Sequence, residues 1–216
     1  MKILNSVDLI DTKSVKGFPQ GRLFLCILKK QEVMLSELIR KRRSIHPPRF
    51  NQKPILREEL EEILEAANWA PTHKKTQPWL FKVMHSEKSR NELGSFLAET
   101  YKSTTANFKE NVFQKMKSNP QKSSAVIAIC MQRNEDLLPE WEEIAAVSMA
   151  VQNMWLLCTE KNIGTYWSSP KLISQAHTFF ELAENQRCLG FLYMGYYDEE
   201  PPYFERESWK SKVEWI

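Results

Sequence analysis

From residue 34 onward, hydrophobic positions recur with a helical period in some stretches and form short continuous runs in others. The clearest helical pattern lies in residues 57–69, where apolar side chains are spaced three or four positions apart. Glu58 and Glu59 stand in its first turn, where acidic groups interact favourably with the helix dipole. The patterns predict helices at 35–43, 57–69, 87–99, about 103–117, 142–161 and 171–182.

Continuous apolar runs predict the strands. Residues 125–130 are uninterrupted apolar positions, which is typical of a strand buried on both faces. A proline-rich loop at 45–56 and a polar loop at 70–78 separate helices from strands, and helices and strands do not strictly alternate. We therefore expect an α+β domain with a central sheet between helices. The predicted strands are 79–84, 124–130, 165–167 and 188–196, and the closing run 213–216 is a candidate strand given to a partner chain.

Residues 1–33 have a different character. They contain Gly17, Pro19 and Gly21, and they show no helical period. Met34, in contrast, opens a clean amphipathic helix. Two interpretations remain open: residues 1–33 form an N-terminal extension packed on the surface, or the true start is Met34 and the domain is 34–216.

Composition adds little to this picture. The length of 216 residues suits one domain, and 42% hydrophobic and 26% charged residues are close to globular averages. The net charge of +3 comes from residues 1–33, because 34–216 hold 24 basic and 24 acidic residues. This balance indicates no nucleic-acid surface. The apolar runs are too short for a bilayer and no secretory signal is evident, so we expect a cytoplasmic protein.

Cysteine and glycine exclude several kinds of site. The four cysteines include no C-x-x-C pair and no histidine at zinc-finger spacing, which argues against structural zinc and a disulfide framework. The six glycines form neither a dinucleotide-binding fingerprint nor a P-loop. If this protein binds a phosphate, side chains or helix N-termini must hold it.

Three segments could carry chemistry. Residues 40–44 read Arg-Lys-Arg-Arg-Ser, which is either a solvated basic helix end or an anion site of guanidinium forks and a hydroxyl. Residues 69–79 concentrate two tryptophans, two lysines and His73 in a loop between a helix and a strand, although such a histidine is usually a surface residue. In 162–170, Gly164 is either a helix C-cap or part of a site in which Trp167 lies beside two serines.

Taken together, these segments resemble the FMN-dependent nitroreductase family, and most closely its small single-domain NAD(P)H nitroreductase branch. No single motif is decisive, but five occur in register, and the resemblance covers residues 34–216. The segments that carry it are 42–44, 70–74 with 77–79, 139–142, 145–161 with Ile163, Gly164 and Trp167, and 190–195.

The resemblance implies a three-layer α+β fold. Its central sheet would be mainly antiparallel and flanked by helices, and its C-terminal segment would extend to the partner subunit. It also implies a homodimer with two FMN molecules at the subunit interface. NAD(P)H would be the co-substrate, and electrons would pass by ping-pong hydride transfer through FMN to a nitroaromatic, a quinone or a similar acceptor.

The resemblance also implies the site residues. Those that would contact FMN from the same chain are Arg42, Arg43, Ser44, Trp167, Ser168, Ser169 and Arg206. Those that would reach the flavin of the other subunit are Trp69 and His73. A turn that would contact the nicotinamide nucleotide consists of Leu157, Cys158, Thr159, Glu160, Lys161 and Asn162. No side chain is assigned as a catalytic acid or base, because the flavin carries the chemistry, and no metal is expected.

Four features depart from the family pattern and leave substrate preference and flavin potential open. His46 stands where many members carry a basic residue near the flavin, and the prolines after it indicate a longer loop. Lys75 replaces a frequent asparagine, and Ser168 stands where an arginine is expected in close relatives. Arg42, His46 and Lys75 are the candidate cations beside the reduced flavin.

Two alternatives to this function remain. One is a flavin reductase or another FMN oxidoreductase on the same fold. The other is a non-enzymatic flavin-binding or interaction protein whose basic residues at 40–43 contact an anionic partner. The neutral charge balance of residues 34–216 argues against the second alternative.

Overall fold

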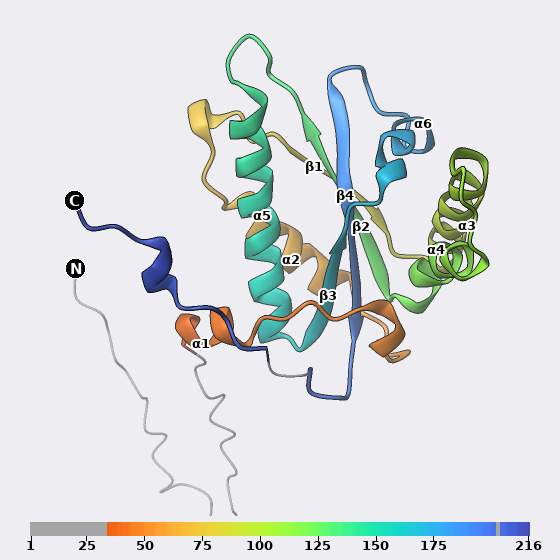
Figure 1. Ribbon diagram of the computed structural model, residues 1–216, viewed down its shortest axis with the longest axis horizontal. Helices are drawn as coiled ribbons and strands as arrows, with labels where there is room; N and C mark the ends of the chain where they lie inside the picture. The colour runs from red at the N-terminus through yellow and green to blue at the C-terminus, as the bar shows by residue number, and fades with distance from the viewer. Residues whose placement is uncertain (1–33, 202–203) are drawn as a thin grey trace, which may run out of the picture. The chain divides into compact units, whose positions relative to one another are not determined.

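The computed structural model describes residues 34–201 and 204–216, which form an α+β unit with one sheet (Figure 1). The two interpretations of residues 1–33 therefore lie outside the described residues. The α-helices are α1 (Leu35–Lys41), α2 (Arg57–Asn68), α3 (Glu87–Thr104), α4 (Glu110–Lys122), α5 (Glu140–Glu160) and α6 (Ala176–Phe179). The strands are β1 (Trp79–Met84), β2 (Ala125–Gln132), β3 (Ile163–Ser168) and β4 (Gln186–Tyr196). Short 3₁₀ turns are η1 (Pro47–Arg49), η2 (His73–Lys75), η3 (Lys171–Gln175) and η4 (Trp209–Lys212).

The sheet has the strand order β1-β2-β4-β3, and all neighbouring strands are antiparallel. Alternate residues of β2 face opposite sides, so Ile127 and Ile129 belong to one core cluster while Val126 and Ala128 belong to the other. The register between β2 and β4 shifts by one position next to Ile129, which places a β-bulge in the middle of the sheet.

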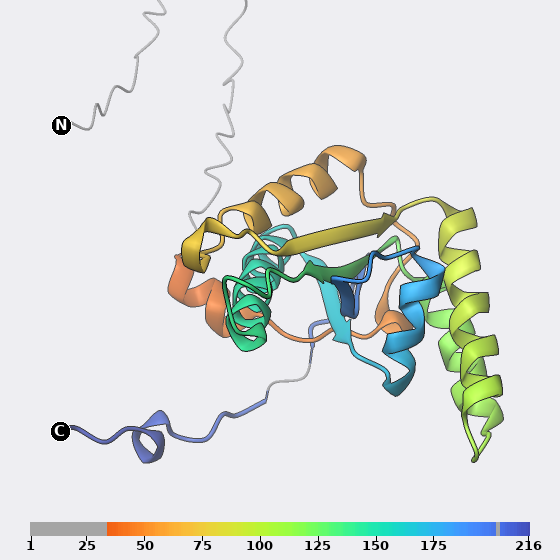
Figure 2. The same cartoon turned by 90° about the horizontal axis from the view of Figure 1, so that it is seen from above.

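Helices cover both faces of the sheet, which gives three layers (Figures 1 and 2). On one face, α2 and α5 pack together over a core that includes Ile63 and Met154. On the other face, α3, α6 and η3 close a second core that includes Leu97 and Phe191, and α4 packs beside α3. The prediction of an α+β fold with an antiparallel central sheet between helices is confirmed. Among the described helices, none has the length and apolar character needed to cross a membrane.

The predicted helices at 171–182 and about 103–117 differ most from the structure, whereas the limits of the other predicted helices agree within five residues. Residues 171–182 were expected to form one helix, but η3 and the single turn of α6 replace it, and the chain leaves this segment through Glu181 in the left-handed region (φ 51°). Leu172 and Ala176 are buried in the structure, and their spacing of four residues also suits one face of a continuous helix, so apolar spacing does not distinguish the two arrangements. The helix expected at about 103–117 begins only at Glu110, because the hydroxyls of Ser103 and Thr104 donate to the Thr100 carbonyl at the end of α3.

The C-terminal segment also differs from expectation. Residues 213–216 form no strand with the described sheet, and the segment after Arg206 contains only the 3₁₀ turn η4. Trp215 is 86% exposed. A sheet partner for this short run must come from elsewhere, so its extension to a second subunit stays a prediction.

Candidate functional site

A cavity of about 520 Å³ lies between the end of α1 and residues 204–206. We call it the arginine cavity. It brings together three of the arginines expected to contact FMN, although two come from one end of the domain and the third from the other. The residues that line it are Ile39, Arg40, Arg42, Arg43, Phe204, Glu205 and Arg206.

Trp155 of α5 contacts two of the arginines that line the arginine cavity. The guanidinium carbon of Arg42 lies 4.6 Å from the centroid of the Trp155 ring, which is a cation–π distance. The indole Nε1 of the same tryptophan donates to the carbonyl of Arg43 at 3.2 Å. The Arg43 guanidinium in turn donates to the carbonyls of Arg40 and, at 3.0 Å, of Arg42, which satisfies acceptors at the C-terminal end of α1.

The arginine cavity concentrates positive charge. Burial, followed by the charges of Arg206 and Arg43, lowers the pKa of Arg42 below its usual value. No ion pair joins Arg42, Arg43 or Arg206 to a carboxylate among residues 34–201 and 204–216, although Glu205 also lines the cavity. Closely spaced guanidinium groups with this surplus of donors are suited to a phosphate.

Ser44 connects the arginine cavity to the sheet. It forms an isolated parallel bridge with Thr165 of β3, and the backbone N–H of Ile45 donates to the Thr165 carbonyl at 2.9 Å. Ile45 is buried, whereas Ser44 is exposed. The pairing anchors the backbone and leaves the hydroxyl of Ser44 available to a ligand.

The end of β3 carries Trp167, Ser168 and Ser169. The first two are half-buried and Ser169 is exposed. Gly190 of β4 lies directly under Trp167, and a side-chain carbon at Gly190 would overlap the indole nitrogen and approach the Ser168 carbonyl to 2.7 Å. The absence of a side chain at Gly190 is therefore what allows the Trp167 indole to lie across the sheet.

The other two predicted flavin contacts lie outside the arginine cavity, His73 beside the start of α5 and Trp69 at the end of α2. His73 of η2 pairs through Nδ1 with the carboxylate of Glu142, in the first turns of α5. The side chain of Trp69 is 78% exposed, and its Nε1 donates to Glu65 at 2.8 Å. A cavity of about 370 Å³ adjoins this pair, and Pro71, Thr72, His73, Trp141, Glu142, Ala145, Ala146 and Met149 line it.

One chain does not bring the two regions together. Glu142 and Trp155 are about 13 residues apart on α5, which corresponds to about 20 Å at the rise of an α-helix. His73 and the arginine cavity therefore belong to two separate regions of a single subunit.

The turn expected to contact a nicotinamide nucleotide offers few free groups. Cys158 is fully buried, and burial raises the pKa of its thiol, so this side chain does not face a nucleotide. Thr159 donates to the Trp155 carbonyl at 2.8 Å, and the Lys161 ammonium pairs with Glu62. Leu157 packs against the core, which leaves only Glu160 and Asn162 exposed.

The remaining candidate cations are separated. The His46 ring lies 4.1 Å from that of Tyr166, and burial, followed by the charge of Lys115, lowers the pKa of His46. Lys75 is exposed in η2 with a left-handed backbone (φ 56°). Only Arg42 of these three belongs to the arginine cavity.

Sequence reasoning missed the roles of Trp155 and Glu142. Trp155 lies in a long apolar helix, where the pattern indicates a core residue, and its contacts with Arg42 and Arg43 depend on tertiary packing. Glu142 belongs to a family-like motif, but its partner His73 is far away in the sequence. The one available signal was the position of a glutamate in the first turn of a helix that follows Pro139.

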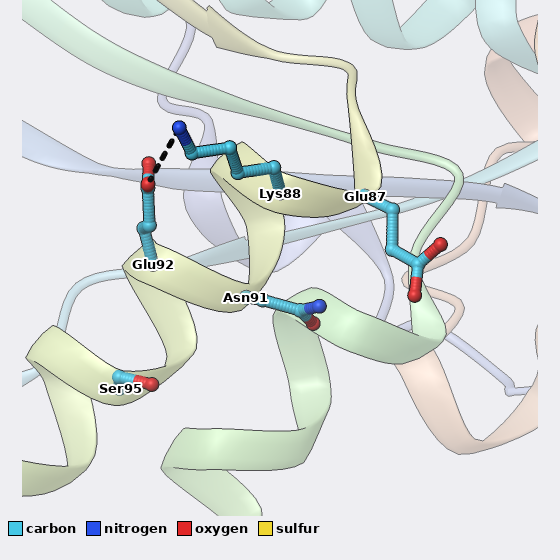
Figure 3. A pocket seen from close by; sticks show the side chains of 5 residues that line it. All are labelled: Glu87, Lys88, Asn91, Glu92 and Ser95. Atoms are coloured by element: carbon cyan, nitrogen blue, oxygen red, sulfur yellow. Dashed lines mark ion pairs between the residues drawn. The ribbon is translucent and has the colours of Figure 1, made fainter.

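A hollow of about 640 Å³ on the outer face of α3 has no comparable character (Figure 3). All the side chains drawn there come from one helix. Lys88 lies 3.8 Å from Glu92 in an exposed i,i+4 ion pair, which is a common feature of solvated helix faces. Nothing in this hollow converges on a ligand.

Comparison with known proteins agrees with the arrangement. Residues 39–196 match the profile of the nitroreductase family. The protein named "Putative NAD(P)H nitroreductase YfhC" from Bacillus subtilis (strain 168) is 32% identical over 173 residues, which is 79% of this chain and 88% of that protein. The sequence match covers both arginines at the end of α1, the loop with His73 and the α5 helix.

Two solved structures share the fold. The nitroreductase-like family protein from Bacillus cereus has a TM-score of 0.74 and 26% identity, over 85% of this chain and 96% of that one. The nitroreductase with bound FMN from Bacteroides fragilis NCTC 9343 has a TM-score of 0.66 and 18% identity, over 85% and 99% of the two chains.

Proposed function

Because the chain belongs to the nitroreductase family, we propose that it is an FMN-dependent oxidoreductase that takes electrons from NAD(P)H. The observation that carries this proposal is the convergence of Arg42, Arg43 and Arg206 on one cavity without carboxylate partners among the described residues. The donor set suits FMN, because its phosphate is a dianion that guanidinium forks bind well. A relative with this fold holds FMN, which also supports the assignment.

The side chains around the cavity have distinct roles in this proposal. Arg42 and Arg206 bind the phosphate, and Arg43 holds the end of α1 in place through the carbonyls of Arg40 and Arg42. The exposed hydroxyl of Ser44 supplies a neutral donor beside them. Trp155 orients the pair of consecutive arginines through its contacts with the Arg42 guanidinium and the Arg43 carbonyl.

Trp167 and the two serines after it extend this surface along the end of β3. Trp167 offers an aromatic face, and Ser168 and Ser169 offer hydroxyl donors for the ring system. When bound, FMN supplies hydride transfer between NAD(P)H and an acceptor, for which we propose nitroaromatics or quinones. The protein contributes binding, orientation and a positive environment.

We propose that the functional unit is a homodimer. His73 pairs with Glu142, about 20 Å along α5 from Trp155, and Trp69 is largely exposed, so both are available to the flavin of a second copy. Exposed aromatic side chains on this part of the surface support the proposal, because Trp69 is 78% and Trp141 is 68% exposed. The C-terminal residues 213–216 are a further segment that a partner would cover.

The visible absorption spectrum of the purified protein, before and after anaerobic addition of NADPH or NADH, tests the proposal. A flavin spectrum that bleaches with one of the nucleotides is the expected result. Steady-state oxidation of that nucleotide with nitroaromatic, quinone and free-flavin acceptors then separates a nitroreductase from a flavin reductase. A protein that takes up no FMN would contradict the proposed function.

A further inference from the structure

The loop that presents His73 has an unusual backbone. Three of its residues other than glycine adopt left-handed conformations: Lys74 (φ 47°), Lys75 (φ 56°) and Gln77 (φ 45°). Side chains disfavour this region, so such a backbone persists only where its surroundings hold it. The contacts that hold this loop therefore determine how His73 is presented.

Two contacts join the loop to the first turn of α5 and to the segment that leads into it. Nδ1 of His73 pairs with Glu142, and Nζ of Lys74 donates to the Leu137 carbonyl at 3.1 Å. Inside the loop, the N–H of Gln77 donates to the Thr72 hydroxyl at 3.1 Å. Glu142 is thus the one side chain outside the loop that contacts the imidazole among the described hydrogen bonds.

The helical turn that carries Glu142 is anchored by hydrogen bonds of its neighbour. The next residue, Glu143, is fully buried and pairs with Arg133 at the end of β2. Its carboxylate also accepts from the backbone N–H of Asn134 at 3.0 Å and from the side-chain amide of Asn134 at 2.8 Å. These bonds fix the first turn of α5, so the Glu142 carboxylate is held where the loop requires it.

The pair also determines which nitrogen His73 offers to a ligand. A carboxylate only accepts hydrogen bonds, so the hydrogen must lie on Nδ1 of His73. Nε2 then remains as the free nitrogen of a side chain that is 59% exposed. Outer groups that hold a histidine in one tautomer commonly tune what its other nitrogen does.

We propose that Glu142 is a positioning residue, which holds the loop at 70–78 in its left-handed form and directs Nε2 of His73 toward the flavin of a second copy. The identity of that ligand rests on the proposed function, whereas the orientation of His73 does not. Glu142 touches neither FMN nor substrate in this scheme and acts through His73.

The test uses the full chain with Glu142→Ala, Glu142→Gln, His73→Ala and the double variant Glu142→Ala/His73→Ala. Glu140→Gln is the matched control, because Glu140 lies in the same helical turn and pairs with Arg187. The first readout is the pair of imidazole ¹⁵N shifts of His73, which report the tautomer and need no flavin. The second is the rate of anaerobic flavin reduction by NADPH.

We expect Glu142→Ala to replace the Nδ1–H tautomer of His73 by a mixture and to slow flavin reduction roughly tenfold. Glu142→Gln keeps an acceptor and should restore most of both signals, while Glu140→Gln should change neither. The double variant should be no slower than His73→Ala. Unchanged ¹⁵N shifts in Glu142→Ala, or independent and multiplicative rate effects of the two single changes, would overturn the proposal.

Failure of the proposed function has a different signature. A wild-type protein that binds no FMN contradicts the oxidoreductase assignment, and the ¹⁵N shifts alone then decide whether Glu142 positions His73. A protein that binds FMN but has the same His73 tautomer with and without Glu142 retains the function and loses the positioning role.

Discussion

The indole of Trp155 contacts two consecutive residues, since its ring lies 4.6 Å from the Arg42 guanidinium carbon and its Nε1 donates to the Arg43 carbonyl at 3.2 Å. A single side chain of α5 thereby fixes both the charge and the backbone at the end of α1. Because α5 also packs on the sheet, the end of α1 is tied to the main hydrophobic core of the domain.

This relationship predicts a graded response to substitution of Trp155. Trp155→Phe keeps an aromatic face but loses the N–H donor, whose net worth of about 1 kcal/mol predicts roughly fivefold weaker FMN binding. Trp155→Leu also loses the cation–π contact and should weaken binding several-fold further. Fluorescence titration of the apoprotein with FMN measures both. Equal affinities of the two variants would contradict the role assigned to the ring.

Gly190 provides a second test at the other side of the site. Gly190→Ala should push the Trp167 indole out of place, with a loss of about 1–3 kcal/mol of stability and weaker FMN binding. Gly94→Ala is the control, because its new methyl group would overlap the Lys117 carbonyl between α3 and α4. The control should lower the urea midpoint but leave the FMN dissociation constant of the folded protein unchanged.

Local sequence patterns predicted most of the helices and strands but none of the tertiary contacts between them. The strand β1 was predicted with the observed limits, and the apolar run at 125–130 identified β2, because a strand buried on both faces needs no partner to be recognisable. The segment 171–182 was mistaken for one helix because the spacing of Leu172 and Ala176, which are buried in the structure, also suits one face of a continuous helix. Periodicity reports burial, and a short segment can achieve the same burial with a different backbone.

In the candidate site, too, the sequence predicted individual residues but not the contacts between them. Arg42, Arg43 and Arg206 were named from motifs, and the structure brings them to one cavity. Trp155 and Glu142 could not be assigned roles from the sequence, because each acts on a segment more than sixty residues away. Cys158 was included in a nucleotide-binding turn, but its position on the helix directs it into the core.

The buried ion pair below His73 makes a prediction about stability. Glu143→Ala leaves Arg133 and Asn134 without their acceptor and should lower the free energy of unfolding by about 3–5 kcal/mol. Glu140→Ala removes a surface ion pair with Arg187 from the same helical turn and should change it by less than about 1 kcal/mol. Urea unfolding monitored by tryptophan fluorescence measures both. Similar losses for the two variants would contradict the importance of the buried pair.

Glu143→Gln tests the same ion pair if Glu143→Ala does not fold well enough to be purified. The amide retains one acceptor for Asn134 and loses the charge that faces Arg133. An unfolding free energy between those of the wild type and Glu143→Ala is expected.

Tyr196 and Glu59 predict how stability depends on pH. The Tyr196 hydroxyl donates to Glu59 at 2.5 Å. Burial, and then this hydrogen bond, raises the pKa of Tyr196 from 10.0 to about 12. Burial alone would raise the pKa of Glu59, but the bonds from Tyr196 and the Leu56 N–H, with the charges of Lys161 and Lys53, lower it overall.

The two pKa shifts have opposite signs, so Tyr196 loses its contribution to stability at high pH and Glu59 loses its contribution at low pH. Since the folded pKa of Tyr196 is raised, its contribution is complete below pH 10 and is lost as the pH rises through 12. Since the folded pKa of Glu59 is lowered, its contribution is complete above its unfolded value of about 4.3 and is lost as the pH falls through the folded value. Tyr196→Phe should lose about 1 kcal/mol at pH 7 and show a flatter pH profile at both ends in urea unfolding. A profile parallel to that of the wild type would contradict this coupling.

The central claim is that the arginine cavity holds the phosphate of FMN, and paired titrations of the apoprotein with FMN and riboflavin test it most directly. The two ligands differ only in the phosphate, so wild-type protein should bind FMN at least about 100-fold more tightly. Arg42→Gln and Arg206→Gln should each weaken FMN binding by about tenfold or more and leave riboflavin binding unchanged. Equal affinity for the two ligands, or variants that bind FMN like the wild type, would contradict the account.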